Sequence, residues 1–214
     1  MDTRIIPQHI ATMENVIIMK HPLITHKISR LRDKNTGTNE FRALVEEIAM
    51  LMGYEALSDL PTEEIEVETP IETCKTEVIA GRKLAIVPIL RAGLGMVSGI
   101  TALVPTAKIG HIGLYRDETT HEPQEYYCKL PDPISERLIV VTDPMLATGS
   151  SMELAYEALR TKGHPAHIHV ASIIASKQAI EYLQRKMPDD ITTIWVAAVD
   201  DELDDHSYIV PGLG

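Results

Sequence analysis

Five short apolar runs along the chain have the pattern of strands buried in a parallel sheet. They cover residues 83–90, 107–114, 138–141, 167–175 and 191–199. A continuous apolar run of this length, bounded by turn residues, is typical of a strand that is covered on both faces. The runs therefore predict a sheet whose strands lie inside the protein.

Several segments between these runs have apolar residues at the spacing of a helix. Apolar positions recur at helical spacing from Thr38 to Gly53, where the glycine is expected just after the helix end. Similar segments follow at 94–104, 150–163 and 176–188, and Ser176 is expected to cap the last one. Strands that alternate with helices of about 12 residues predict right-handed crossovers. The predicted fold is α/β, a mainly parallel twisted sheet flanked by helices, in a single domain over residues 1–214.

Three segments fit this alternation less well. Residues 1–37 are locally basic and predicted to be irregular, with a short helix near Ile28 and Leu31. Residues 61–78 alternate between apolar and acidic positions, which predicts one peripheral or subunit-contacting strand. Residues 115–133 are polar and contain several prolines, which predicts a flexible arm or lid. We treat 1–37 and 115–133 as appendages of the domain.

Composition narrows the class of protein. The net charge of −11 disfavours nonspecific nucleic-acid binding, which needs clustered cations. No apolar run approaches the roughly 20 residues of a membrane helix, and the N-terminus lacks a secretory pattern. The cysteines Cys74 and Cys128 are not a disulfide framework, and the scattered histidines do not fall at metal-site spacing. His167 and His169 alternate along one strand and are expected on a solvated face. We expect a cytoplasmic protein without membrane or nucleic-acid partners.

The strongest candidate chemistry follows the run at 138–141. Asp143 ends that strand, a loop rich in small and hydroxyl residues follows, and a helix begins near Ser150. Ser150 and Glu153 have the spacing of a capping box. Unpaired amides at a helix start bind phosphate, because the helix dipole favours negative charge there. A carboxylate ahead of such a loop suits sugar hydroxyls, so the stretch fits a ribose 5-phosphate. An ordinary strand–turn–helix connection with a well-capped helix also fits.

A second candidate follows the run at 83–90. Arg91 stands at the carboxyl end of that strand, before the small residues Ala92 and Gly93. Open α/β sheets bind ligands in the crevice at this edge, and a guanidinium fork suits a diphosphate. Without further information, a surface arginine beside a helix start is a better interpretation of Arg91 than a diphosphate ligand.

The amino-acid sequences of five segments resemble those of the uracil phosphoribosyltransferases, which belong to the type I phosphoribosyltransferases. The first segment is the Asp-Pro-Met-Leu-Ala-Thr-Gly stretch at 143–149, where the family usually continues with a second glycine and this chain has Ser150. The others are Pro-Ile-Leu-Arg-Ala-Gly-Leu-Gly-Met at 88–96, Tyr-Arg-Asp-Glu at 115–118, the segment at 21–36, and Tyr-Ile-Val-Pro-Gly-Leu-Gly at 208–214. The family continues past this last glycine with Asp-Ala-Gly-Asp-Arg, whereas the sequence ends at Gly214.

The resemblance implies transfer of ribose 5-phosphate from phosphoribosyl pyrophosphate to N1 of uracil, which gives UMP and diphosphate. It implies catalytic roles for Asp143 and Arg116 and a base site at Tyr208, Ile209 and Gly214. The implied phosphoribosyl pyrophosphate site comprises Arg91, Arg116, Asp143, Pro144, Met145, Leu146, Ala147, Thr148, Gly149, Ser150 and Ser151.

The resemblance also implies partners beyond the two substrates. Mg²⁺ is expected with the diphosphate, held mainly by substrate oxygens and water rather than by protein ligands. GTP is a possible allosteric activator in this family, and a homo-oligomer, dimer or tetramer, is expected. Two other hypotheses stay open: a transferase for another base, and a non-catalytic regulator with the same fold.

Overall fold

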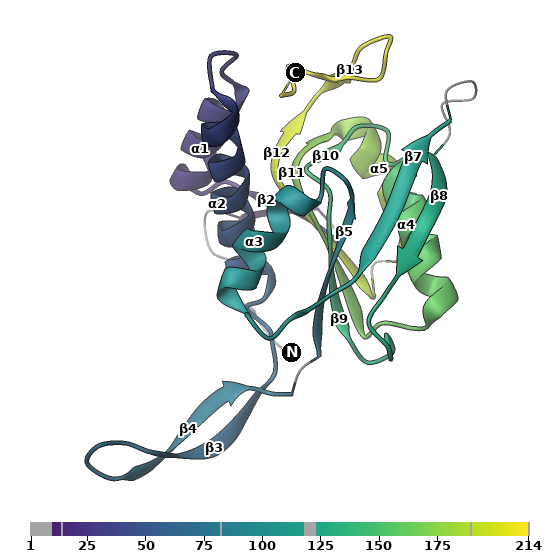
Figure 1. The fold of residues 1–214 in the computed structure, drawn as a ribbon. Coiled ribbons are helices and arrows are strands. Elements are labelled where there is room, and N and C mark those ends of the chain that lie inside the picture. Colours follow the sequence, from purple (N-terminus) through teal and green to yellow (C-terminus); the bar gives the residue numbers. More distant parts are fainter. Residues whose placement is uncertain (1–9, 14, 82, 118–122, 189, 214) are drawn as a thin grey trace.

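The apolar runs form neighbouring strands of one central sheet in the computed structural model (Figure 1). The structure describes residues 10–13, 15–81, 83–117, 123–188 and 190–213. In spatial order the main strands are β1 (Ile10–Met13), β2 (Val16–Met19), β12 (Thr192–Asp200), β11 (His167–Ser176), β9 (Leu138–Thr142), β5 (Leu84–Leu90), β7 (His111–Arg116) and β8 (Pro123–Lys129).

Six of these strands, from β2 to β7, run parallel, and β1 and β8 are antiparallel at the two edges. Two short strands extend the sheet: β6 (Lys108–Ile109) pairs with β5, and β10 (Met145–Leu146) pairs with β11. The predicted α/β fold with a mainly parallel sheet is confirmed.

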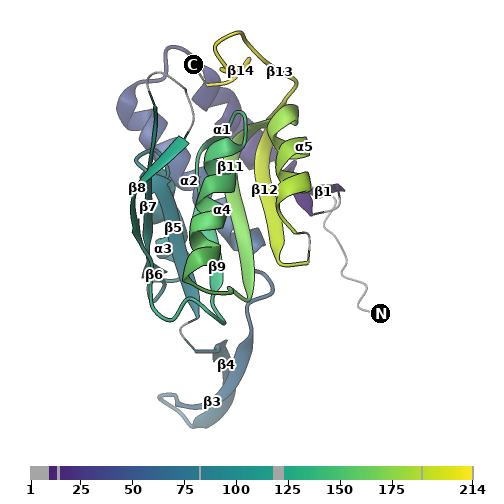
Figure 2. The ribbon, with the colours of Figure 1, turned by 90° about the vertical axis from the view of Figure 1, so that its right-hand side faces the viewer.

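Helices cover both faces of the sheet (Figures 1 and 2). One face carries α1 (Pro22–Arg32), α2 (Thr38–Ala56) and α3 (Leu94–Leu103), whose apolar side chains pack with β12 and β11. The other face carries α4 (Ser150–Lys162) and α5 (Lys177–Lys186). Each face buries its own apolar cluster, which explains why the central strands are apolar on both sides.

The N-terminal segment is more ordered than the sequence suggests. Strand β2 joins the sheet beside β12, and α1 buries Ile24, Ile28 and Leu31 against the core. The prediction of irregular structure is therefore wrong for these residues, although a helix containing Ile28 and Leu31 is confirmed. Residues 1–9 lie outside the described part of the chain.

Two predicted boundaries are also wrong. Helix α2 continues past Gly53, whose missing side chain lets α2 approach Ile100 and Leu103 of α3. The acidic segment 61–78 is a hairpin of β3 (Thr62–Glu68) and β4 (Thr73–Ile79) rather than one strand. The turn around Thr69 and Glu72 reverses the chain without interrupting the alternation of residue types.

The prediction of a solvated face for the two histidines is wrong for His169, which is 3% exposed. Its Nδ1 accepts a hydrogen bond of 3.0 Å from the indole N–H of Trp195 on the adjacent strand β12. Burial, and secondarily the nearby His167, lower the pKa of His169 to about 4. The ring is therefore neutral at physiological pH.

Among the described residues, none of the helices combines the length and the apolar character that crossing a bilayer requires.

Candidate active site

The carboxyl ends of the parallel strands gather the candidate residues at one edge of the sheet. Strand β5 lies between β9 and β7, so Arg91, Arg116 and Asp143 follow or end three adjacent strands. The C-terminal hairpin of β13 (Glu202–Leu203) and β14 (Ile209–Val210) and the β7–β8 hairpin rise on either side of this edge (Figure 1). Such an edge is where open α/β sheets bind ligands.

The loop between β9 and α4 is fixed to the sheet by its backbone. The N–H of Asp143 donates to the carbonyl of Ala171, and the carbonyl of Pro144 accepts from Ile173 and Ile174, at 3.1–3.2 Å. Met145 and Leu146 then pair with β11 as the short strand β10. Asp143 and Pro144 are half-buried beside the loop's opening, whereas Leu146 is buried as a core residue.

Helix α4 begins without a side-chain cap. The position before it is Gly149, which has a φ of +86° and lies against Ala179, Tyr182 and Leu183 of α5. The Ser150 hydroxyl hydrogen-bonds to that of Thr148 at 2.9 Å. The predicted capping box is therefore wrong, because a left-handed glycine rather than Ser150 precedes the helix.

The side chain of Glu153 does not reach back to the start of α4, as a capping box would require. Its carboxylate accepts from the Tyr182 hydroxyl and pairs with Lys186 at 2.9 Å. The Tyr182 hydrogen bond, assisted by Lys186, holds the pKa of Glu153 below its ordinary value. The negative charge at the start of α4 is therefore neutralised on the outer side, which leaves the first-turn amides directed at the loop suited to an anion.

The loops that follow β5 and β9 touch each other. The Thr142 hydroxyl donates a 3.0 Å hydrogen bond to the carbonyl of Gly93, and a Cβ on Gly93 would lie 2.2 Å from the carbonyl oxygen of Thr142. Arg91 stands two residues before this contact, is exposed, and is joined to Leu90 by a cis peptide bond. The structure thus brings the loops that carry Arg91 and Asp143 into contact.

Arg116 ends β7 next to this position, but its side chain lies outside the described part of the structure, as do residues 118–122. The predicted arm forms the antiparallel β7–β8 hairpin within its described residues.

Comparison with known proteins decides the family. The family model described as uracil phosphoribosyltransferase matches residues 18–214. Two curated proteins named uracil phosphoribosyltransferase are similar to the chain. The one from Thermoanaerobacter sp. (strain X514) is 57% identical over 201 residues, 94% of each chain. The one from Clostridioides difficile (strain 630) is 54% identical over 202 residues, 94% of this chain and 95% of that one.

The chain belongs to the uracil phosphoribosyltransferase family. A solved structure of the AQ2163 protein from Aquifex aeolicus has the same fold, with a TM-score of 0.87 and 35% identity. The match covers 93% of this chain and 94% of the Aquifex aeolicus chain. These similarities favour neither of the two other hypotheses, a transferase for another base or a non-catalytic regulator.

The segment that resembles the family's base loop forms a small hairpin of β13 (Glu202–Leu203) and β14 (Ile209–Val210). Asp204 organises its turn, because its carboxylate accepts from the amides of His206 and Tyr208 at 2.8–2.9 Å. Ile209 is buried, Tyr208 is exposed, and Gly214 lies outside the described residues. The hairpin follows the carboxyl end of β12, and Asp143 follows the carboxyl end of the parallel strand β9, so both lie at the same edge of the sheet.

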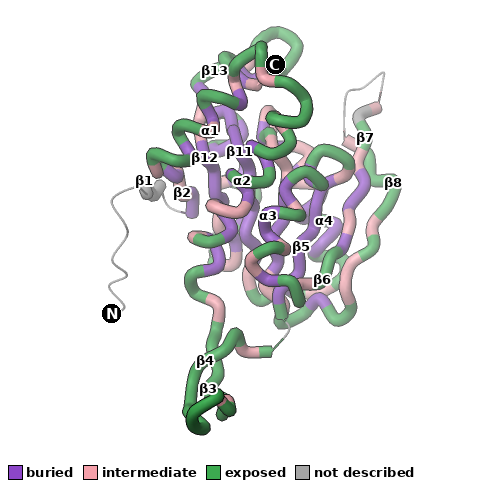
Figure 3. The backbone as a smooth tube through the Cα atoms, turned by 60° about the vertical axis from the view of Figure 1, so that its left-hand side comes forward, coloured by how far each residue is buried: buried purple, intermediate pink, exposed green. Residues whose placement is uncertain are grey.

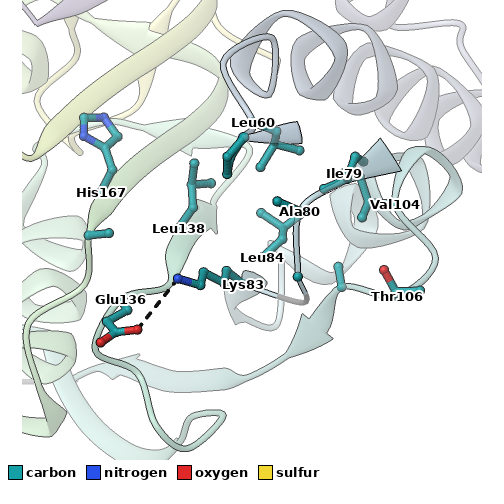
Figure 4. A pocket seen from close by; sticks show the side chains of 14 residues that line it. Leu60, Ile79, Ala80, Lys83, Leu84, Val104, Thr106, Glu136, Leu138 and His167 are labelled. Carbon is teal, nitrogen blue, oxygen red and sulfur yellow. Dashed lines mark ion pairs between the residues drawn. The ribbon is translucent and has the colours of Figure 1, made fainter. Parts of the chain in front are cut away.

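A defined cavity lies at the other edge of the sheet. It measures about 260 Å³ and is lined by mainly apolar residues at the amino ends of β5, β9 and β11 and the base of the β3–β4 hairpin (Figure 4). Lys83 and Glu136 face each other across it at 3.7 Å. In a family member of this topology, the substrates belong at the carboxyl edge instead.

Two supporting residues could not have been identified as part of the site from the sequence. Thr142 has no distinguishing feature within its strand, and its hydrogen-bond partner Gly93 lies 49 positions away in the sequence. Ser176 was expected only as a helix cap, which is confirmed by the bond from the Ala179 amide. Its hydroxyl also donates to the carbonyl of Ala147, at 2.6 Å. This bond holds the loop between β9 and α4 against the start of α5.

Proposed function

We propose that this protein transfers ribose 5-phosphate from phosphoribosyl pyrophosphate to N1 of uracil, with UMP and diphosphate as products. One observation carries the proposal: the uncapped start of α4, preceded by Asp143, lies beside the loop that holds Arg91. This arrangement offers a phosphate site, a carboxylate and a cation at one edge of the sheet. Membership of the uracil phosphoribosyltransferase family supports the choice of base.

Each part of the site has a chemical role in this proposal. The loop 147–151 holds the 5-phosphate through backbone amides and hydroxyls. Asp143 accepts hydrogen bonds from the ribose hydroxyls and stabilises positive charge that develops on the sugar. Arg91 and Arg116 hold the diphosphate and stabilise the charge that grows on it as the bond to the sugar breaks. Pro144, Met145 and Leu146 shape the loop between these groups.

The base site is proposed on the C-terminal loop. Backbone groups at Ile209 and Gly214, with Tyr208 beside them, would recognise uracil by hydrogen-bond polarity. Fixed backbone donors suit the O4 acceptor of uracil and leave the amino group of cytosine unpaired. The buried side chain of Ile209, which packs with the core, supports a fixed position for this backbone.

We propose that Mg²⁺ accompanies the diphosphate. No group of three or more His, Cys, Asp or Glu side chains within the described ranges is placed to hold a metal. Because Mg²⁺ keeps several waters and binds substrate phosphates, substrate oxygens and water would supply most of its ligands, with Asp143 as the nearby carboxylate. The ion would add positive charge where the diphosphate leaves.

A homo-oligomer, dimer or tetramer, is supported by the β3–β4 hairpin. It projects from the domain, and none of its residues is buried (Figure 3). Ile71 at its tip is 92% exposed, and Ile65, Val78 and Ile79 are also exposed. An isolated two-stranded hairpin is marginal in water, so contact with a second copy would stabilise it. Light scattering of the native chain and of an Ile65→Asp variant would test this.

GTP activation and a cytoplasmic location remain proposals. GTP rests on the family resemblance alone, and a rate that does not change when GTP is added would contradict it. The location is supported by the two free thiols, of which Cys74 is exposed. Cell fractionation would test the location.

A turnover assay tests the central proposal. Purified protein with phosphoribosyl pyrophosphate, Mg²⁺ and uracil should form UMP, whereas cytosine, hypoxanthine and orotate should give negligible product. Calorimetric titration with uracil, with and without the sugar diphosphate, separates binding from turnover. Binding of the sugar diphosphate without turnover of any base would favour a regulator, and turnover of a different base would favour the other transferase.

A further inference from the structure

A salt bridge joins helix α1 to strand β12 next to the C-terminal loop. Arg32 is the last residue of α1, and Asp200 is the last residue of β12. Their contact is a two-pronged pair, in which Nη1 donates to Oδ2 at 2.8 Å and Nη2 donates to Oδ1 at 2.7 Å. The side chain of Asp200 is 7% exposed and that of Arg32 is 22% exposed, so the pair is largely shielded from water.

The same pair holds both polar backbone atoms of Gly212. Arg32 Nη1 donates to the Gly212 carbonyl at 2.9 Å, and the Gly212 amide donates to Asp200 Oδ2 at 3.1 Å. Gly212 has a φ of +63°, and a Cβ there would lie 2.1 Å from the carbonyl oxygen of Ile209. The turn from 209 to 212 is therefore fixed at one point by two charged side chains from other elements.

We infer that Arg32 and Asp200 are positioning residues for the base site, an inference that rests on the proposed function. Backbone groups cannot adjust by rotamer changes, so a site built from them needs the whole loop held in place. A displacement of about 1 Å in such a group costs on the order of 100-fold in rate. Arg32 and Asp200 supply that constraint without touching the base themselves.

The pair and the phosphate loop are held by different side-chain contacts, although Asp200 is the strand partner of Ser176. Within the described residues, neither Arg32 nor Asp200 bonds to the loop 147–151, where Ala147 accepts from the Ser176 hydroxyl and Thr148 bonds to Ser150, while Met145 and Leu146 just before it pair with β11. Loss of Arg32 should therefore change the use of uracil and leave the use of phosphoribosyl pyrophosphate nearly intact. A purely structural role would affect both substrates together.

The experiment compares Arg32→Gln with Arg30→Gln under steady-state conditions. Arg30 lies on the same helix and forms an exposed pair with Glu40 at 2.5 Å, so its loss controls for charge and helix chemistry. For Arg32→Gln we expect the KM for uracil to rise about tenfold or more, with the KM for phosphoribosyl pyrophosphate within about twofold of the native value. Arg32→Lys, which keeps the charge but not the fork, should restore part of the affinity.

Three outcomes would overturn the inference: an unchanged KM for uracil, an equal rise in both KM values, or the same effect in Arg30→Gln. If Arg32→Gln does not fold, Asp200→Asn replaces it, since the amide oxygen still accepts from Gly212 while the charge that holds Arg32 is lost. The proposed function fails separately, when the native chain itself does not convert uracil to UMP.

Discussion

The hydroxyl of Thr142 donates a hydrogen bond to the carbonyl oxygen of Gly93, which joins the loops after β9 and β5. Because any Cβ at position 93 would collide with the backbone of Thr142 and Ile89, Gly93→Ala must push these loops apart. We expect kcat/KM for phosphoribosyl pyrophosphate to fall by about tenfold or more. Steady-state kinetics would measure this.

Gly37→Ala is the matched control, because a Cβ at Gly37 meets nothing within 4 Å. That variant should keep native kinetics, and because Gly37 is the N-cap of α2 it should lose about 1 kcal/mol or less in stability. Native kinetics in Gly93→Ala would show that the contact between the loops does not matter for the reaction.

Ser176→Ala should weaken both the fold and the phosphate loop. It removes the cap of α5 and the bond to the carbonyl of Ala147, and both losses occur in a fully buried position. We expect the free energy of unfolding to fall by about 1–2 kcal/mol and the KM for phosphoribosyl pyrophosphate to rise. Denaturant titration and kinetics check the two effects. Ser29→Ala, at an exposed serine of α1, should stay within about 0.5 kcal/mol of the native stability.

Asp143→Asn should separate binding from rate. The amide keeps the shape of the side chain and can still bond to ribose hydroxyls, but it lacks the charge that stabilises a cationic sugar. We expect kcat to fall by about tenfold or more while the affinity for phosphoribosyl pyrophosphate, measured by calorimetry, changes little. Asp132→Asn, at an exposed residue, serves as the control. A native kcat would remove Asp143 from the mechanism.

Arg116→Ala should lower kcat/KM by about tenfold or more while the thermal unfolding curve stays close to native. The expected cause is the loss of a cation from the leaving diphosphate. The comparison variant is Arg42→Ala, since Arg42 is exposed on α2. Near-native kinetics in Arg116→Ala would leave Arg91 as the proposed cation for the diphosphate.

His169 should make the fold sensitive to mild acid. Its pKa is about 4 in the folded protein against an ordinary 6.5, owing to burial and to His167, with Asp59 opposing. Between these pH values the unfolded chain binds a proton that the folded chain does not. This contribution to stability is therefore complete above about pH 6.5 and declines as the pH falls toward 4, by up to about 3 kcal/mol.

Denaturant titrations at several pH values would measure this slope. His169→Gln, which keeps an acceptor for Trp195 but does not titrate, should flatten it. His164→Gln, at an exposed histidine, should not. An identical slope in the native chain and in His169→Gln would show that other groups cause the acid sensitivity.

The sequence predicted those features whose cause is local. The strand at 138–142 follows from its run of apolar residues, and the helix after Ser176 follows from a serine placed before a periodic segment. The loop at 143–149 could be proposed as a sugar-phosphate site because a carboxylate, then small and hydroxyl residues, then a helix start each suit part of that ligand. Arg91 needed the resemblance as well, since one arginine after a strand is common.

The features that the sequence did not predict depend on contacts between distant segments. The burial of His169 requires Trp195 on the neighbouring strand, and nothing near His169 signals it. The pair of Arg32 with Asp200 spans 168 positions. The start of α4 at Ser150 was predicted correctly, but its cap was misassigned. The spacing of Ser150 and Glu153 fits a capping box, while Tyr182 and Lys186 on α5 offer Glu153 better partners.

The left-handed glycine before α4 has a thermodynamic consequence. A helix that starts without a cap is stabilised by whatever anion settles on its first turn, so substrate and secondary structure are coupled. The Glu153 amide already donates to the Gly149 carbonyl and that of Ser150 to the Thr148 hydroxyl, so the amide hydrogens of residues 151 and 152 should exchange slowly only when a phosphorylated sugar is present. The resistance of this protein to heat would then report how much substrate surrounds it.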